Sequence, residues 1–192
     1  VGLERLAYSA LASSNNKVAV NCLEAIIQNY TGIDEKDYKA ALAIAYAMDG
    51  QMEKSTKMLA KVKKENANWI GIHMVEGWIL LLDNKFTEGI SAFEKAESAD
   101  YPIYPKIGQA IGHYQMKNYY QSSTLFNELE TYQDYAPFQN NSELLAMSGY
   151  SYLNTYDFYN VHTNFQKYRE INGADNCYYI GMGIFSFRLY EY

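Results

Sequence analysis

The side chains that could do chemistry are few in this sequence, and they are far apart. Among 192 residues there are three histidines (His73, His113 and His162) and two cysteines (Cys22 and Cys177). Catalysis and metal binding need such groups to converge, and no histidine has a cysteine, aspartate or second histidine at the spacing of metal ligands. We therefore expect histidines that pack between helices, reduced thiols, no metal site, no cofactor and no enzymatic activity.

Motifs that would hold a phosphate or a nucleophile are also missing from the sequence. There is no HExxH, no GxxxxGK and no GxSxG. The run Lys61–Lys64 falls at the end of a predicted helix, where lysines complement the helix dipole. The chemistry that remains is that of a binding surface.

The charge balance limits which partners that surface could have. The sequence carries 16 Lys+Arg against 22 Asp+Glu, a formal net charge of −6. Nucleic acids and anionic membranes are bound by clustered Lys and Arg, so neither is an expected partner. The longest fully apolar stretch, Trp78–Leu82, is far shorter than the roughly 20 residues of a spanning helix. We expect no membrane insertion and a cytoplasmic protein.

Tyrosine is the most over-represented residue type. There are 20 tyrosines, and 16 of them fall in residues 97–192, which also carry 10 acidic against 5 basic residues. Tyrosine gives a large contact area at low entropic cost. The second half is therefore the better place to look for a partner, one with basic and apolar character.

A repeat of about 34 residues organises the chain. Six short turn-like segments each close on one residue, and these closing residues are separated by 34, 34, 33, 39 and 34 positions: Val18, Met52, Phe86, Tyr119, Phe158 and Tyr192. Nine positions before each lies a usually small residue: Ser9, Ala43, Gly77, Ala110, Gly149 and Gly183. Three positions after each closing residue the side chain is mostly small, and seven positions after it the side chain is apolar. In the first unit these residues are Asn21 and Ala25.

This period fits two helices of about 12–15 residues joined by short turns. The small residue on the first helix lets the second approach closely. Apolar residues recur at helical spacing between the turns, as at Ile70, Met74 and Leu81, and no strand-like alternation is present. Asp34 and Ser142 are predicted N-caps, and Pro102, Pro105 and Pro137 are predicted to lie in joints or first helical turns.

The pattern resembles the tetratricopeptide repeat (TPR) family. The third unit fits its signature best, with Gly77, Leu80, Phe86, Gly89, Phe93 and Ala96, and the fifth offers Gly149, Tyr152, Phe158, Val161, Phe165 and Tyr168. The resemblance implies an all-α, right-handed solenoid of about five and a half helix-turn-helix units. Their approximate bounds are 2–34, 36–69, 70–102, 103–141, 142–175 and a half unit at 176–192.

The ends and the one insertion carry further expectations. The chain starts at Val1 and stops after the first helix of its sixth unit, so we expect a piece of a longer protein from which a leader could have been removed. The 39-residue interval places an insertion at 134–141. This segment is either a tolerated surface loop or an aromatic loop that closes one side of a groove.

In the TPR family the first helices line the concave face that usually holds the ligand. The resemblance places a peptide-binding groove at apolar and aromatic residues of these helices: Ile44, Met74, Trp78, Tyr104, Ile107, Ile111, Tyr114 and Tyr150. It implies a non-enzymatic scaffold or adaptor that binds a protein or peptide. The alternative that these side chains pack against the chain's own superhelix or its missing portion stays open.

Two other functions stay open as well. The chain could be a ligand-sensing or regulatory segment of a larger transcription regulator or of a secretion or assembly factor. It could also be a self-association module, a homodimer in which the bare sixth first helix pairs with a second copy.

Overall fold

The protein is all-α, as the sequence predicts. The computed structural model describes residues 2–29, 35–97 and 102–190, without the side chains of Ala12, Ala136 and Pro137. Within these ranges the chain forms eleven α-helices and one 3-10 helix, and no strand. Asp34, a predicted N-cap, lies outside the described residues. The chain divides into two compact units, residues 1–96 and 97–192.

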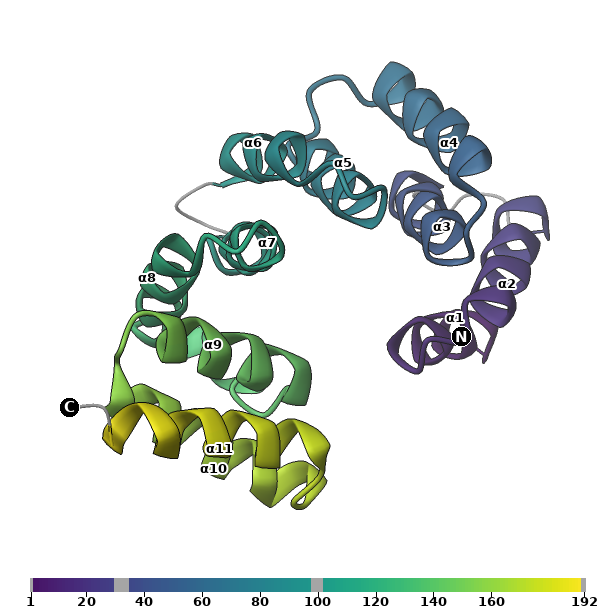
Figure 1. Ribbon diagram of the computed structural model, residues 1–192. Coiled ribbons are helices and arrows are strands. Elements are labelled where there is room, and N and C mark those ends of the chain that lie inside the picture. The colour runs from purple at the N-terminus through teal and green to yellow at the C-terminus, as the bar shows by residue number, and fades with distance from the viewer. Residues whose placement is uncertain (1, 30–34, 98–101, 191–192) are drawn as a thin grey trace. The chain divides into compact units, whose positions relative to one another are not determined.

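The first unit contains three helix pairs (Figure 1). Its helices are α1 (Gly2–Ala12), α2 (Asn16–Asn29), α3 (Glu35–Met48), α4 (Met52–Glu65), α5 (Gly71–Leu82) and α6 (Phe86–Ala96). α1 packs on α2, α3 on α4 and α5 on α6. The second helix of each of the first two pairs also packs on the first helix of the next pair, which is the consecutive packing of a helical repeat.

The second unit contains two pairs and one further helix. Its elements are α7 (Ile103–Gln115), α8 (Tyr119–Glu130), the 3-10 helix η1 (Gln133–Phe138), α9 (Ser142–Asn154), α10 (Phe158–Asn172) and α11 (Asn176–Tyr190). α7 packs on α8 and α9 on α10, while α11 contacts both α9 and α10. Pro102 is the N-cap of α7, Pro105 lies in its first turn and Pro137 lies in η1, as predicted.

The turn inside every pair has the same backbone. One residue in each turn has a positive φ: Ser14, Gly50, Asn84, Lys117 and Tyr156. The next residue donates its N–H to the carbonyl five positions earlier, as Gln51 does to Tyr46 at 2.8 Å and Asn118 to His113 at 2.9 Å. This left-handed C-cap ends the first helix and lets the second begin two residues later.

The shared turn corrects the predicted register of the first pair. The second helix starts at the closing residue in four pairs, but α2 starts at Asn16, two residues before the predicted Val18. The residues at the recurring packing places are therefore Ala7, Ala19 and Leu23, each 0% exposed, whereas the predicted Ser9 and Asn21 are exposed. The sequence did not show the correct register because the closing residue of this pair, Asn16, is polar rather than bulky and apolar. Its Nδ2 donates to the Met48 carbonyl at 2.9 Å.

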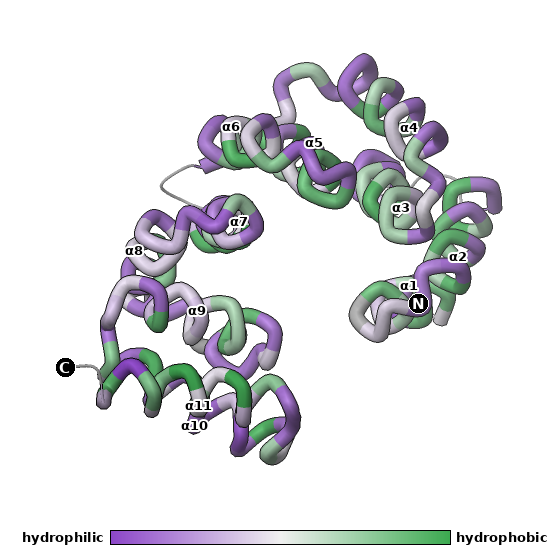
Figure 2. The backbone as a smooth tube through the Cα atoms, viewed as in Figure 1, coloured by the Kyte–Doolittle hydropathy of each residue, from purple (hydrophilic) through white to green (hydrophobic). Residues whose placement is uncertain are grey.

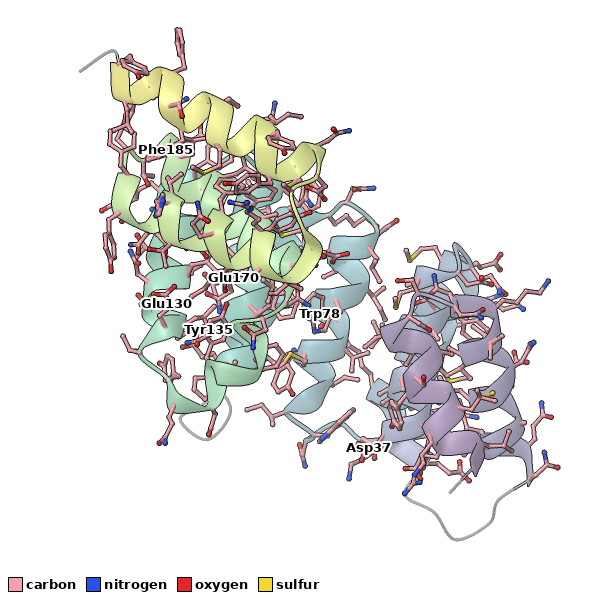
Figure 3. All side chains as sticks on the ribbon, turned by 90° about the horizontal axis from the view of Figure 1, so that it is seen from below. Asp37, Trp78, Glu130, Tyr135, Glu170 and Phe185 are labelled. Atoms are coloured by element: carbon pink, nitrogen blue, oxygen red, sulfur yellow. The ribbon has the colours of Figure 1, made fainter. Side chains whose placement is uncertain are left out.

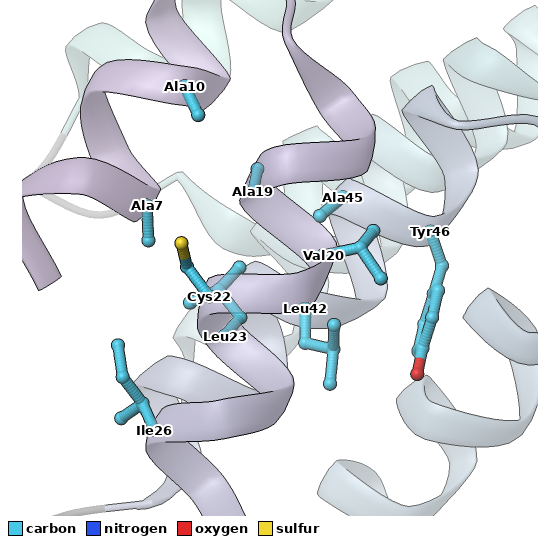
Figure 4. Packing of buried hydrophobic residues seen from close by; sticks show 10 residues of the cluster. All are labelled: Ala7, Ala10, Ala19, Val20, Cys22, Leu23, Ile26, Leu42, Ala45 and Tyr46. Atoms are coloured by element: carbon cyan, nitrogen blue, oxygen red, sulfur yellow. The ribbon is translucent and has the colours of Figure 1, made fainter. Parts of the chain in front are cut away.

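Small residues let the helices of a pair approach closely. A Cβ added to Gly77 on α5 would lie 2.7 Å from the Phe93 ring of α6, and one added to Gly149 on α9 would lie 3.0 Å from Phe165 of α10. Both phenylalanines are fully buried. Figure 4 shows the corresponding packing of α1, α2 and α3, where alanines take the place of glycine. Within the units, close packing therefore occurs inside pairs and, from α2 to α3, between them.

Serine hydroxyls form hydrogen bonds where the two helices of a pair approach closely. Ser55 Oγ donates to the Ala43 carbonyl at 2.7 Å, and Ser122 Oγ donates to the Ala110 carbonyl at 3.0 Å. Both serines are fully buried, and both bonds join the second helix of a pair to the first, twelve residues earlier. A small polar residue is tolerated there because its hydroxyl is satisfied by a helix carbonyl.

Two smaller sequence predictions have different outcomes. The predicted N-cap Ser142 is wrong by one residue, because the Asn141 side chain accepts the Leu144 N–H at 3.0 Å and Ser142 is the first helical residue. The cysteines are free thiols, with Cys22 buried and Cys177 partly buried. No helix among the described residues is long and apolar enough to cross a membrane.

Candidate functional site

The eight predicted binding residues all lie on the first helices of pairs. Ile44 is on α3, and Met74 and Trp78 are on α5, so these three belong to the first unit. The other five belong to the second unit: Tyr104, Ile107, Ile111 and Tyr114 are on α7, and Tyr150 is on α9. The predicted residues therefore divide between the two units, three in the first and five in the second.

In the first unit Ile44 and Trp78 pack against the hydrophobic core of their own helices. Ile44 packs against the cluster that contains Ala43 and Val75. Trp78, which Figure 3 labels, meets the buried Phe93 ring edge-on, with centroids 5.2 Å apart. Ile44, Met74 and Trp78 are each partly exposed. They present an apolar surface, but truncating Trp78 would also remove packing from Phe93.

In the second unit α7 presents residues of very different exposure. Ile107 is buried, at 4% exposure, and belongs to the core. Tyr104 is 52% exposed, and its ring meets Phe138 of η1 edge-on, at 5.4 Å between centroids. Ile111 and Tyr114 are partly exposed. The surface at α7 is therefore formed by Tyr104, Ile111 and Tyr114.

Tyr114 and Tyr150 come together with Cys177, a residue that the sequence does not predict at this site. Tyr150 Oη donates to the Cys177 carbonyl at 3.3 Å, and the Tyr150 ring meets Phe165 at 5.2 Å. Burial, together with Cys177 and Tyr114 nearby, raises the pKa of Tyr150 to about 12. Burial also raises the pKa of Tyr114, with smaller effects from Tyr119 and Cys177. Three consecutive first helices, α7, α9 and α11, thus contribute to one cluster.

No sequence signal could have placed Cys177 in this cluster. It lies 27 residues after Tyr150, whereas equivalent positions of neighbouring pairs here lie 34 apart. The contact depends on how α11 sits against α9, and this is a property of packing rather than of the repeat.

The insertion between α8 and α9 is anchored in the core. Tyr135 of η1 is 5% exposed, and its ring stacks on Phe138 at 5.9 Å between centroids. Burial, with the nearby Glu130 carboxylate, raises the pKa of Tyr135 to about 12. Figure 3 shows Tyr135 and Glu130 close together on the second unit. The insertion is therefore anchored to the core through Tyr135, while Asp134, Asn140 and Asn141 remain exposed.

A small hollow lies beneath this insertion. Its volume of about 10 Å³ is room for one water molecule, and buried Ser148 donates its hydroxyl to Asn164 Oδ1 at 2.7 Å on its wall. Glu130 and Lys167 also line it, and burial raises the pKa of the Glu130 carboxyl. The hollow is too small to hold an organic ligand.

The histidines lie among structural contacts. His73 Nδ1 is 3.6 Å from Glu76 Oε2, and the other oxygen of that carboxylate takes a hydrogen bond from Lys63 Nζ at 2.6 Å. Burial alone would raise the pKa of Glu76, but Lys63 and His73 outweigh it and hold the pKa below its ordinary value. His162 lies 6.4 Å from the Phe185 ring. The described residues include no group of three His, Cys, Asp or Glu side chains that could hold a metal ion.

The sequence matches no protein-family model, and no curated protein is significantly similar to it.

Proposed function

We propose that this chain is a right-handed TPR-type solenoid and a non-enzymatic scaffold that binds a peptide on the first helices of its second unit. The observation that carries the proposal is the aromatic surface of α7 and α9. Tyr104 is half exposed, and Tyr114 and Tyr150 are partly exposed beside Ile111 on the same two helices. Large aromatic side chains that keep some exposure are the usual anchors of peptide recognition.

The charge of the second unit supports a particular kind of peptide. Residues 97–192 carry twice as many acidic as basic residues. An acidic surface attracts basic partners and speeds their encounter, while apolar rings supply most of the binding energy. We therefore propose a peptide with bulky apolar anchors and flanking Lys or Arg.

A selection from a random peptide library tests this function without a known partner. Peptides selected on the full chain should be enriched in apolar anchors flanked by basic residues. Tyr104→Ala should weaken their binding about tenfold or more, as expected when an anchor of an interface is truncated. Fluorescence anisotropy of a labelled peptide measures the affinity.

Tyr120→Ala is the matched control, because Tyr120 is 69% exposed but lies on α8, a second helix. Its affinity should equal that of the unsubstituted protein. The proposal is wrong if selection yields no peptide above background, or if Tyr104→Ala and Tyr120→Ala bind equally well.

A further inference from the structure

The helix α11 has one face buried and one face bare. Its inner face packs on the preceding pair through Tyr178, Gly181 and Phe185, and an added Cβ at Gly181 would clash with Phe165. Phe185, labelled in Figure 3, meets the Phe158 ring of α10 at 5.8 Å between centroids. Arg188 donates to the Leu153 carbonyl. These contacts fix how α11 is rotated.

The opposite face is apolar and exposed, and much of α11 is green in Figure 2. Tyr179 is 63% exposed, Ile180 57% and Phe187 65%. Gly183 lies between them, and a Cβ added there would meet no atom within 4 Å. Equivalent places are covered in other pairs: Gly149, 34 residues before Gly183, lies under Phe165, and Leu153, 34 before Phe187, is 1% exposed. In the other pairs the equivalent face of the first helix is therefore covered by the second helix of the pair.

The α5–α6 pair shows which helix fits such a face. Each of its helices carries a glycine followed four residues later by a large apolar residue: Gly77 and Leu81 on α5, Gly89 and Phe93 on α6. Because the helices run antiparallel, Phe93 covers Gly77, and Leu81 covers Gly89 with 3.1 Å to an added Cβ. The two contacts are related by an approximate twofold axis between the helices.

α11 carries the same pair of residues at the same spacing, Gly183 and Phe187. A second α11 laid antiparallel would place each Phe187 on the other copy's Gly183, which is the α5–α6 contact made symmetric. The face carries no charge that would repel its own copy. Arg188 is the single charged residue of α11, and it points to Leu153 and the Tyr156 ring, 5.1 Å away.

We propose that the face formed by Tyr179, Ile180, Gly183, Ile184 and Phe187 is a homodimer interface whose partner is the α11 of a second copy. The interface is isologous, so one patch serves both subunits. It lies on the side of α11 opposite to its contacts with α9 and α10, and it is independent of the proposed peptide surface on α7 and α9.

Sedimentation velocity of the full chain over a concentration series tests the interface. The unsubstituted protein should sediment as a dimer at the higher concentrations. Gly183→Leu should sediment as a monomer, because the new side chain would occupy the place of the partner's Phe187, and a Cβ at this position meets no atom of its own subunit within 4 Å. Gly2→Leu is the matched control, since an added Cβ at Gly2 also meets no atom within 4 Å, and it should leave the dimer intact.

A mixing experiment tests the pairing of the two residues. Phe187→Ala should also weaken the dimer, and far-ultraviolet circular dichroism should show unchanged helix content in every variant. Mixing Gly183→Leu with Phe187→Ala should restore a heterodimer, detected by native mass spectrometry. In that complex the introduced leucine faces the introduced alanine, and the second glycine–phenylalanine contact is intact.

Three results would overturn the proposal. The first is an unsubstituted protein that stays monomeric at every concentration, which would show that the exposed face of α11 does not bind a second copy. The second is a Gly183→Leu variant that dimerises like the unsubstituted protein, which would place the interface elsewhere. The third is a mixture of the two variants that forms no heterodimer.

Discussion

Tyrosine hydroxyls join successive helix pairs at one recurring place. Tyr46 Oη on α3 donates to Glu24 of α2, and Tyr152 Oη on α9 donates to Asn127 Oδ1 of α8 at 2.8 Å. Both tyrosines lie six residues before the second helix of their own pair, and both acceptors lie eight residues into the second helix of the preceding pair. Part of the tyrosine excess is therefore structural, because each ring fills the core while its hydroxyl finds an acceptor at the edge.

Removing one of these hydroxyls should destabilise the protein measurably. Tyr152 is 0% exposed, so Tyr152→Phe keeps the packing but removes the close donor of Asn127 Oδ1, which keeps only the longer bond of 3.5 Å from Asn160 Nδ2. We expect a loss of about 1 kcal/mol in the free energy of unfolding, measured by urea denaturation. Tyr159→Phe, at a tyrosine that is 79% exposed, should change it by far less. Equal effects in the two variants would contradict the role given to the Tyr152 hydroxyl.

At the scale of helices, the sequence predicts four of the five complete pairs in register. The small and bulky residues of those pairs recur at fixed distances from a bulky closing residue. The register of the first pair could not be predicted in this way. The polar Asn16 is its closing residue, and the apolar Val18, two residues later, fits the expected residue type better. The sequence shows the start of a second helix only where the closing residue is bulky and apolar or aromatic. In the first pair the start is shown by the positive φ of Ser14, a backbone feature that the sequence does not reveal.

The candidate site could be predicted only in part. The sequence places Tyr104, Tyr114 and Tyr150 on first helices, and the structure has them there. The burial of Ile107 and the contact of Tyr150 with Cys177 depend on the rotation of α7 and α11 against their neighbours. The burial of Tyr135 in η1 could not be predicted either, because no other described pair has an insertion at this place from which to infer its packing.

The close approach of α5 and α6 gives a prediction at this scale. Gly77→Ala would put a Cβ 2.7 Å from the Phe93 ring, so the ring or the helix must shift. Overpacking of this kind costs roughly 1–3 kcal/mol, more than alanine gains from its helix propensity. Thermal or urea unfolding would measure the loss in the free energy of unfolding.

A second substitution separates overpacking from other causes. In the double variant Gly77→Ala/Phe93→Leu the shorter side chain leaves room for the methyl group, so the two changes should destabilise less together than the sum of each alone. Strict additivity would show that Gly77 is not needed for the approach of the two helices.

Across the whole molecule, buried and half-buried tyrosines make stability depend on alkaline pH. The pKa of Tyr46, Tyr135 and Tyr150 is raised to about 12, mainly by burial, against 10.0 for an unperturbed tyrosine. A pKa raised by folding means that the stability is fully present below pH 10 and is lost as the pH rises from 10 through 12. Unfolding by urea at increasing pH should show this loss, followed in parallel by tyrosinate absorbance. A free energy of unfolding that stays constant over this range would contradict the prediction.

The first helices of the second unit are proposed to bind a peptide, and this is the central claim about the molecule. Hydrogen–deuterium exchange of the full chain, with and without a peptide selected on it, tests this claim most directly, because it locates the contact without substitutions. We predict that the peptide slows exchange in α7 and α9, at Tyr104–Tyr114 and around Tyr150, and leaves α8 and α10 unchanged. Protection confined to α8 and α10, or no protection in the second unit, would contradict the claim.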